Sequence, residues 1–124
     1  MTNPSPPVVG LLLSQDLFFS SKITGTANVL GVKFTVKNSA ANVLAALENH
    51  AETIRLVVID LSLPGLKIGD LITAFPETFR PDVIAYDAHV KTESLQAAQA
   101  AGCDEVLSRG QFSSRLPEII GRYA

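Results

Sequence analysis

The sequence predicts an α/β fold built on a single parallel β-sheet, and three observations support this prediction. Five short runs of aliphatic and β-branched residues alternate with segments whose apolar residues recur at helical spacing. Parallel strands need crossover connections, which such helices supply. The length of 124 residues, 47% of them hydrophobic and 18% charged, suits one compact domain. We therefore expect residues 8–124 to form one domain and residues 1–7, with three prolines, to be a disordered lead-in.

The strands and helices can be placed in chain order. The expected strands are Val8–Leu13, Val32–Val36, Arg55–Asp60, Asp82–Tyr86 and Glu105–Ser108. A helix is expected after each strand, and the third helix should be short because two prolines precede the fourth strand. Several residues are typical of helix ends: Ser39 and Thr92 as N-caps, Ser113 or Ser114 as the N-cap of a last helix with Pro117 in its first turn, and Gly31 and Gly102 just past a helix.

The strand patterns also predict positions in the sheet. Val8–Leu13 and Arg55–Asp60 are apolar on both faces, as central strands covered by two helix layers must be. Val32–Val36 alternates apolar residues with Lys33 and Thr35, which is typical of an edge strand. The order 2-1-3-4-5 satisfies both patterns, so we expect a flavodoxin-like (βα)5 doubly wound sheet. The predicted core includes Leu11, Leu13, Val57, Ile59 and Ile84.

Composition and short motifs exclude several classes of function. Ten Lys and Arg against twelve Asp and Glu give a net charge of −2, without a basic run for nucleic acid. The first apolar stretch, Val8–Leu13, is far too short to cross a membrane. The single cysteine excludes an internal disulfide, and no zinc-type spacing or phosphate-binding glycine motif follows a strand. We therefore expect a cytoplasmic protein that binds neither nucleic acid nor membrane.

In a sheet of this order, functional residues lie beyond the carboxyl ends of the strands, beside the point where the strand order reverses. The residues at those ends are Ser14, Gln15 and Asp16 after the first strand, Asp60 and Asp87 closing the third and fourth, and Arg109 after the fifth. Asp60 is the most informative of them, because a carboxylate directly after a buried apolar strand is costly unless it faces a polar cleft.

Three stretches carry a resemblance to a known family: LVVIDLSLPGLKIGDLI around Asp60, VIAYDAH around Asp87, and AQAAGCDEVLSR before Arg109. With them the chain resembles the CheY-like receiver domain of response regulators in two-component systems, over residues 8–123. The resemblance places Asp60 at the phospho-acceptor position. It also implies signalling by phosphorelay and through protein–protein contacts, with a histidine kinase or another signalling protein as partner.

The sequence departs from that family at most of the positions that the resemblance assigns to the phosphorylation switch. The acidic pair that would hold Mg²⁺ is matched by Ser14 and Gln15, so Asp16 and Asp60 are only weak candidate ligands and we expect weak or no Mg²⁺ binding. The hydroxyl residue of the switch is matched by Asp87, whose carboxylate would repel a phosphoryl group. The aromatic position on the fifth strand is matched by Val106, and the lysine position by Arg109.

These departures favour an atypical pseudo-receiver, not an enzyme, that acts as a protein–protein interaction module without phosphorylation or with only weak phosphorylation at Asp60. Two alternatives remain: a functional phospho-acceptor in a His–Asp phosphorelay, and a small flavodoxin-like ligand-binding protein. We expect Arg109 to pair with Asp60, Asp87 or both, because two carboxylates facing one cleft would otherwise repel. By resemblance, the binding face, and a possible homodimer interface, is formed by the fourth helix, fifth strand and fifth helix, with Val90, Lys91, Val106 and Gln111 exposed.

Overall fold

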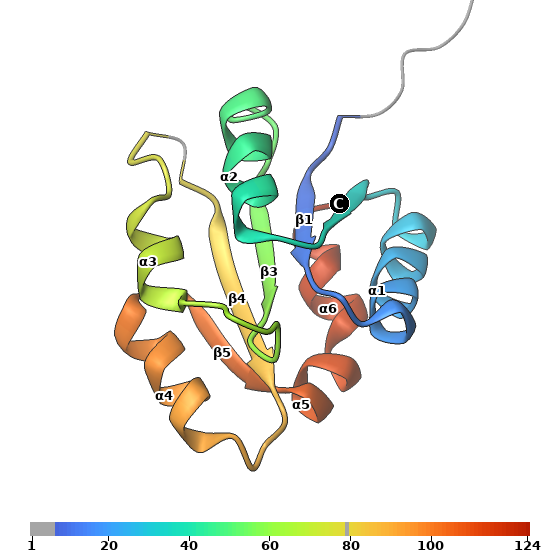
Figure 1. Ribbon diagram of the computed structural model, residues 1–124. Coiled ribbons are helices and arrows are strands. Elements are labelled where there is room, and N and C mark those ends of the chain that lie inside the picture. Colours follow the sequence, from blue (N-terminus) through green and yellow to red (C-terminus); the bar gives the residue numbers. More distant parts are fainter. Residues whose placement is uncertain (1–6, 79) are drawn as a thin grey trace, which may run out of the picture.

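The computed structural model describes residues 7–78 and 80–124 and contains a five-stranded, all-parallel sheet in the order β2-β1-β3-β4-β5 (Figure 1). The predicted topology is therefore confirmed. The strands are β1 (Gly10–Leu13), β2 (Phe34–Lys37), β3 (Leu56–Asp60), β4 (Asp82–Asp87) and β5 (Glu105–Ser108). Residues 1–6, most of the expected lead-in, lie outside the described part of the chain.

The helices lie in two layers, with α2, α3 and α4 on one side of the sheet and α1, α5 and α6 on the other (Figure 1). Their bounds are α1 (Leu17–Val29), α2 (Ala40–Asn49), α3 (Ile68–Thr73), α4 (Thr92–Ala101), α5 (Arg109–Ser114) and α6 (Leu116–Gly121). The third helix has only six residues, as its prolines predict. Within 7–78 and 80–124, no helix is long and apolar enough to cross a membrane.

Strand β2 is an edge strand, as its alternating pattern predicts, and Lys33 and Lys37 remain partly exposed. Its pairing with β1 sets Phe34 opposite Gly10. A Cβ atom on Gly10 would lie 2.4 Å from the Phe34 ring, so only glycine leaves room for this ring against the central strand. The close approach therefore fixes the edge strand to the sheet.

Each face of the sheet has its own apolar core. Alternate residues of β1 and β3 point to opposite faces, and the five predicted core residues are all at most 1% exposed. Leu11, Leu13, Val57 and Ile59 pack toward α2, α3 and α4. Ile84 packs on the other face, with residues from α1, α5 and α6. The sheet is thus buried from both sides, and its carboxyl edge is where polar groups can emerge.

The end of the chain differs from the expected single helix. Helix α5 begins at Arg109 because Ser108 caps it: its hydroxyl accepts a hydrogen bond from the Gln111 amide, and the Gln111 side chain accepts one from the Ser108 amide. Helix α6 starts separately after Arg115, since Pro117 has no N–H to continue the α5 ladder. The prediction that Ser113 or Ser114 caps this helix is wrong.

Two smaller points concern the other helix ends. Ser39 caps α2 as expected, with its side chain accepting from the Asn42 amide. Gly102 ends α4 at a φ of 98°, in the left-handed region that glycine adopts without strain. The expected N-cap Thr92 is instead the first helical residue of α4, and Lys91 takes the cap position without a side-chain hydrogen bond.

Candidate functional site

The candidate site lies at the carboxyl edge of the sheet, where β1, β3, β4 and β5 end side by side. Asp60 is the last residue of β3, and Asp87 is the last residue of β4. Ser14 follows β1 directly, and Arg109 is the first residue of α5 after β5. The fold thus brings together the residues that the sequence analysis selected, although their side chains do not make the contacts that were expected.

Asp60 is only 2% exposed, and its carboxylate is satisfied by hydroxyl and amide donors. The Ser14 hydroxyl donates to Oδ2 at 2.9 Å. The Ser62 hydroxyl and the Ser62 amide both donate to Oδ1, at 2.6 and 3.0 Å. The amide contact closes an Asx-turn, in which an aspartate side chain accepts a hydrogen bond from the backbone amide two residues later. The buried Asp60 carboxylate is therefore held by hydrogen bonds, and no positively charged side chain of the described residues pairs with it.

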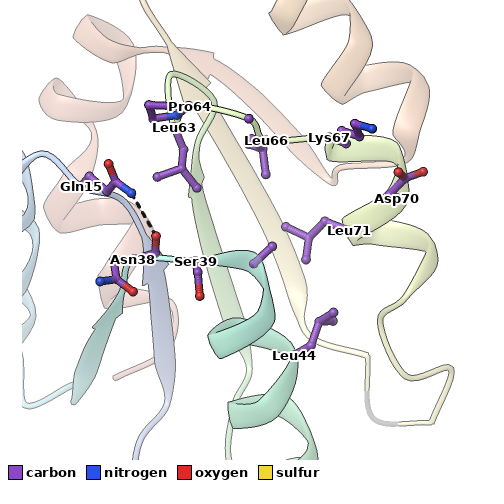
Figure 2. A pocket seen from close by; sticks show the side chains of 12 residues that line it. Gln15, Asn38, Ser39, Leu44, Leu63, Pro64, Leu66, Lys67, Asp70 and Leu71 are labelled. Carbon is purple, nitrogen blue, oxygen red and sulfur yellow. Dashed lines mark hydrogen bonds between the residues drawn. The ribbon is translucent and has the colours of Figure 1, made fainter.

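Gln15 lines a neighbouring pocket, where its side chain points toward Asn38 (Figure 2). Its Nε2 donates to the backbone oxygen of Asn38 at 3.3 Å, which connects the β1–α1 loop to the β2–α2 loop. The pocket has a volume of about 430 Å³ and lies between α2 and the β3–α3 loop, where Leu63, Leu66 and Leu71 point into it. Gln15, one of the two residues matched to the metal-binding acidic pair, thus makes a contact between two loops.

Asp87 is also buried, at 4% exposure, and it contacts the start of α4. Its Oδ2 accepts a hydrogen bond of 2.6 Å from the Ser94 hydroxyl, and its Oδ1 accepts one of 2.8 Å from the Ala88 amide. The Ser94 hydroxyl also lies 3.1 Å from the backbone oxygen of Lys91. These contacts fix the first turn of α4 to the end of β4.

The prediction that Arg109 pairs with Asp60 or Asp87 is wrong. Its Nη1 lies 3.8 Å from Oδ2 of Asp16, and its guanidinium sits over the Phe19 ring, 5.5 Å from the centroid. Asp16 is the N-cap of α1, and its Oδ1 accepts from the Phe19 amide at 3.1 Å. The carboxylates of Asp60 and Asp87 accept hydrogen bonds from serine hydroxyls. Asp16 is the carboxylate that remains for Arg109, on the side of the sheet where α5 begins.

An aromatic cluster that was not predicted from the sequence lies directly under this arginine. The rings of Phe19, Tyr86 and Phe112 are in mutual contact, with centroids 5.0 to 6.0 Å apart. Among residues 7–78 and 80–124, the buried Tyr86 hydroxyl has no hydrogen-bond partner. Burial raises the pKa of Tyr86, and the nearby Asp60 carboxylate raises it further. A large aromatic ring therefore lies near the site, but it belongs to the buried Tyr86 on β4. The β5 position that the resemblance assigns to an aromatic residue holds Val106 instead.

The surface formed by α4, β5 and α5 is partly as expected. Val90, Lys91 and Gln111 are exposed, and Val90 is 68% accessible. Val106 is half-buried and packs against the core, so the expectation that it is exposed holds only in part. A groove of about 320 Å³ runs between these elements and is lined on both sides by glutamines. We call this region, with Val90, Lys91, Gln96, Val106 and Gln111, the α4–β5–α5 face.

Comparison with solved structures shows the fold of response-regulator receiver domains. A receiver domain from Bermanella marisrubri has a TM-score of 0.79 at 16% identity, covering 95% of this chain and 98% of that one. The receiver domain of the Pseudomonas aeruginosa sensor histidine kinase PA1611, solved with magnesium in its active-site cleft, has a TM-score of 0.76 at 19% identity, with coverages of 95% and 98%.

A third similar structure, NtrX from Brucella abortus, has a TM-score of 0.74 at 19% identity, covering 95% of this chain. This chain spans only 27% of the NtrX chain. No protein-family model and no curated protein matches the sequence. The comparisons therefore establish the fold, while the chemistry of the site depends on its own residues.

Proposed function

We propose that this chain is an atypical receiver domain that acts in signal transduction by binding a protein partner, without phosphorylation of Asp60. The observation that carries the proposal is the state of the Asp60 carboxylate. It already accepts three hydrogen bonds, from the Ser14 and Ser62 side chains and the Ser62 amide. A carboxylate that attacks a phosphoryl group needs a cation to neutralise the developing charge, and hydrogen bonds to its lone pairs make it a weaker nucleophile.

The donor atoms around Asp60 do not fit the Mg²⁺ ion that the fold family uses. Mg²⁺ is held in an octahedral set of oxygens, in which one or two carboxylates have lone pairs free for the ion and waters fill other positions. Here the Ser14 hydroxyl donates to Asp60, and Gln15 is bonded to Asn38. Asp16, the remaining carboxylate on this loop, caps α1 and faces Arg109. Among residues 7–78 and 80–124, no group of three or more His, Cys, Asp or Glu side chains could hold a metal ion.

We propose the α4–β5–α5 face as the surface that binds the partner, which is a histidine kinase or another signalling protein. The hydrogen bond from Ser94 to Asp87 supports this assignment, because it keeps the start of α4 in one position. A surface that is already in its binding conformation loses less conformational entropy on association. Its groove combines apolar side chains with glutamines, and these provide contacts that do not depend on a phosphoryl group.

The proposal is tested by incubating the protein with acetyl phosphate and Mg²⁺ and measuring its intact mass. We expect the mass to stay unchanged, and we expect no change in thermal unfolding when beryllofluoride and Mg²⁺ are added. Asp60→Asn serves as the matched control for any modification elsewhere in the chain. A gain of one phosphoryl group that Asp60→Asn abolishes would overturn the proposal and establish the chain as a phospho-acceptor.

A second experiment restores the missing metal ligands. In the double variant Ser14→Asp/Gln15→Asp, the loop after β1 gains two carboxylates in addition to Asp16, and the Ser14 hydroxyl that donates to Asp60 is removed. We expect this variant to bind Mg²⁺, measured by calorimetry, while the wild type does not. Equal Mg²⁺ affinity in the two proteins would show that the serine and the glutamine are not what prevents metal binding.

A further inference from the structure

Beside the candidate site, a pocket lies between α2 and the β3–α3 loop. Its volume of about 430 Å³ is within the range of pockets that hold small molecules. Leu63 and Leu71, which are at most 8% exposed, and the half-buried Leu44 and Leu66 give it an apolar lining. The buried aspartates and the arginine at the strand ends do not line it, so its chemistry differs from that of the candidate site.

Backbone hydrogen bonds shape the loop that forms one wall of the pocket. The Leu63 amide donates to the backbone oxygen of Asp60, and the Leu66 amide donates to that of Leu63, each at 3.2 Å. Between them, Gly65 has a φ of 75°, a conformation that glycine adopts without strain. The loop is therefore held in shape by the chain itself, which reduces the conformational entropy that a ligand would lose on binding.

The polar groups on the β2–α2 side of the pocket are already used within the chain. Nε2 of Gln15 donates to the backbone oxygen of Asn38. Oδ1 of Asn38 accepts from the side chain of Asn42, and Oγ of Ser39 accepts from the Asn42 amide. The charged head of a ligand must therefore find its partners on the opposite side, at the start of α3.

Two opposite charges lie on that side (Figure 2). Lys67 is the N-cap of α3 without a side-chain hydrogen bond, and Asp70 is in the first turn of the helix. In the part of the chain that the structure describes, neither side chain forms an ion pair. A ligand with only a carboxylate would be repelled by Asp70, and a ligand with only an ammonium would be repelled by Lys67. A head that carries both charges is complementary to this pair.

We propose that this pocket binds a free α-amino acid with a large apolar side chain. The apolar side chain of the ligand packs on the four leucines, its carboxylate faces Lys67 and its ammonium faces Asp70. Because both charged partners are exposed, their contacts contribute little, and we expect millimolar affinity. No residue that lines the pocket belongs to the α4–β5–α5 face, so the inference does not depend on the proposed function.

The test compares three probes that share a phenyl body and differ in the head. L-phenylalanine carries both charges, phenylpropionate carries only the carboxylate, and phenylethylamine carries only the ammonium. Each probe is titrated into the isotope-labelled full chain, and the amide chemical shifts in NMR spectra report affinity and location. We expect L-phenylalanine to bind most tightly and to shift the amides of residues that line the pocket. Equal affinity for the three probes, or the absence of saturable shifts at these residues, would overturn the proposal.

Variants of the two charged residues test the head of the ligand. Lys67→Gln should weaken the binding of L-phenylalanine and phenylpropionate by roughly threefold without weakening that of phenylethylamine. Asp70→Asn should weaken L-phenylalanine and phenylethylamine and spare phenylpropionate. Lys91→Gln is the matched control, because Lys91 is also an N-cap without a side-chain hydrogen bond, followed by an acidic residue in the first turn of α4, and it does not line the pocket. An equal loss of affinity in Lys91→Gln and Lys67→Gln would contradict the proposal.

A pocket-filling variant tests the place of binding. Leu66→Trp puts a larger side chain into the pocket from a half-buried loop position, so the core of the sheet is not overpacked. We expect this variant to keep the circular dichroism spectrum of the wild type and to lose binding of all three probes. A folded Leu66→Trp protein that binds L-phenylalanine like the wild type would place the ligand elsewhere and refute the proposal. If the variant does not fold, Lys67→Gln and Asp70→Asn decide the question.

Discussion

The two faces of the sheet are packed in different ways. Under α1, α5 and α6, the contacting rings of Phe19, Tyr86 and Phe112 fill the space beside the candidate site. Under α2, α3 and α4, the core is aliphatic, and pockets of about 430 and 630 Å³ lie beside α2. Leu44 lines both pockets. The short α3 is one cause of the difference, since six residues cover little of the sheet.

This difference shows how the two sides support the carboxyl edge. Arg109 rests on the ring of Phe19, so its position is fixed by large side chains that pack closely. Gln15, on the other side, reaches Asn38 across the rim of a pocket and is exposed. We expect the aromatic face to contribute more to stability and the aliphatic face to tolerate more change.

The largest effect is expected from Phe112→Ala. Phe112 is fully buried and stacks on Tyr86 at 5.1 Å, so its removal leaves a cavity among rings that cannot easily collapse. The free energy of unfolding should fall by about 3 to 5 kcal/mol. Urea denaturation measures this loss. A loss smaller than about 1 kcal/mol would mean that the aromatic face is no more rigid than the aliphatic one.

Leu44→Ala makes the same kind of truncation on the aliphatic face. Leu44 is half-buried between two pockets that already exist, so little new cavity is created. The free energy of unfolding should fall by only about 1 kcal/mol. The same urea titration measures it. A loss equal to that of Phe112→Ala would remove the contrast between the faces.

Tyr86→Phe tests the contribution of the hydroxyl to stability separately from that of the ring. The ring contacts are kept, and the variant removes a buried hydroxyl that has no hydrogen-bond partner in the described part of the chain. The free energy of unfolding should stay the same or rise by up to about 1 kcal/mol. Destabilisation, measured by thermal unfolding, would show that the hydroxyl does have a partner near Asp60.

The smallest effect is expected from surface charges on α6. Hydrogen bonds from Arg115 and Arg122 lower the pKa of Glu118, which is fully exposed. A lowered pKa in the folded state means that the stabilisation is present above the ordinary value of 4.5 and is lost as the pH falls through the lower folded value. Glu118→Gln should therefore make the thermal midpoint slightly less dependent on acid pH. A large change would mean that ion pairs, and not rings, stabilise this face.

Much of the fold could be predicted from local patterns. The edge position of β2 follows from the alternation around Lys33, and the short α3 follows from its prolines. The last helix lies where the sequence predicts it, with Pro117 in its first turn, but the separate helix α5 before it was not predicted, although its capping pair of Ser108 and Gln111 is visible in the sequence. These features depend on a few residues that are neighbours in the sequence, so the sequence alone can predict them.

The contacts of the site were harder to predict, because they depend on which way side chains turn in three dimensions. Asp60 and Asp87 do lie at neighbouring strand ends, as expected. The donors from Ser62 and Ser94 were missed, even though Ser62 stands two residues after Asp60, where aspartates often accept from the backbone. No local pattern indicates that Arg109 turns toward Asp16.

The serine donors to Asp60 have a consequence for how such a domain could be controlled. Hydroxyl groups of the same chain cannot be removed by a chelator, and their hydrogen bonds, unlike ion pairs, are little screened by salt. Under the proposed function, the conformation of the domain would not follow the supply of phosphoryl donors or divalent ions. The number of partner complexes would then follow the abundance of the protein, so its synthesis and degradation would set the strength of the response.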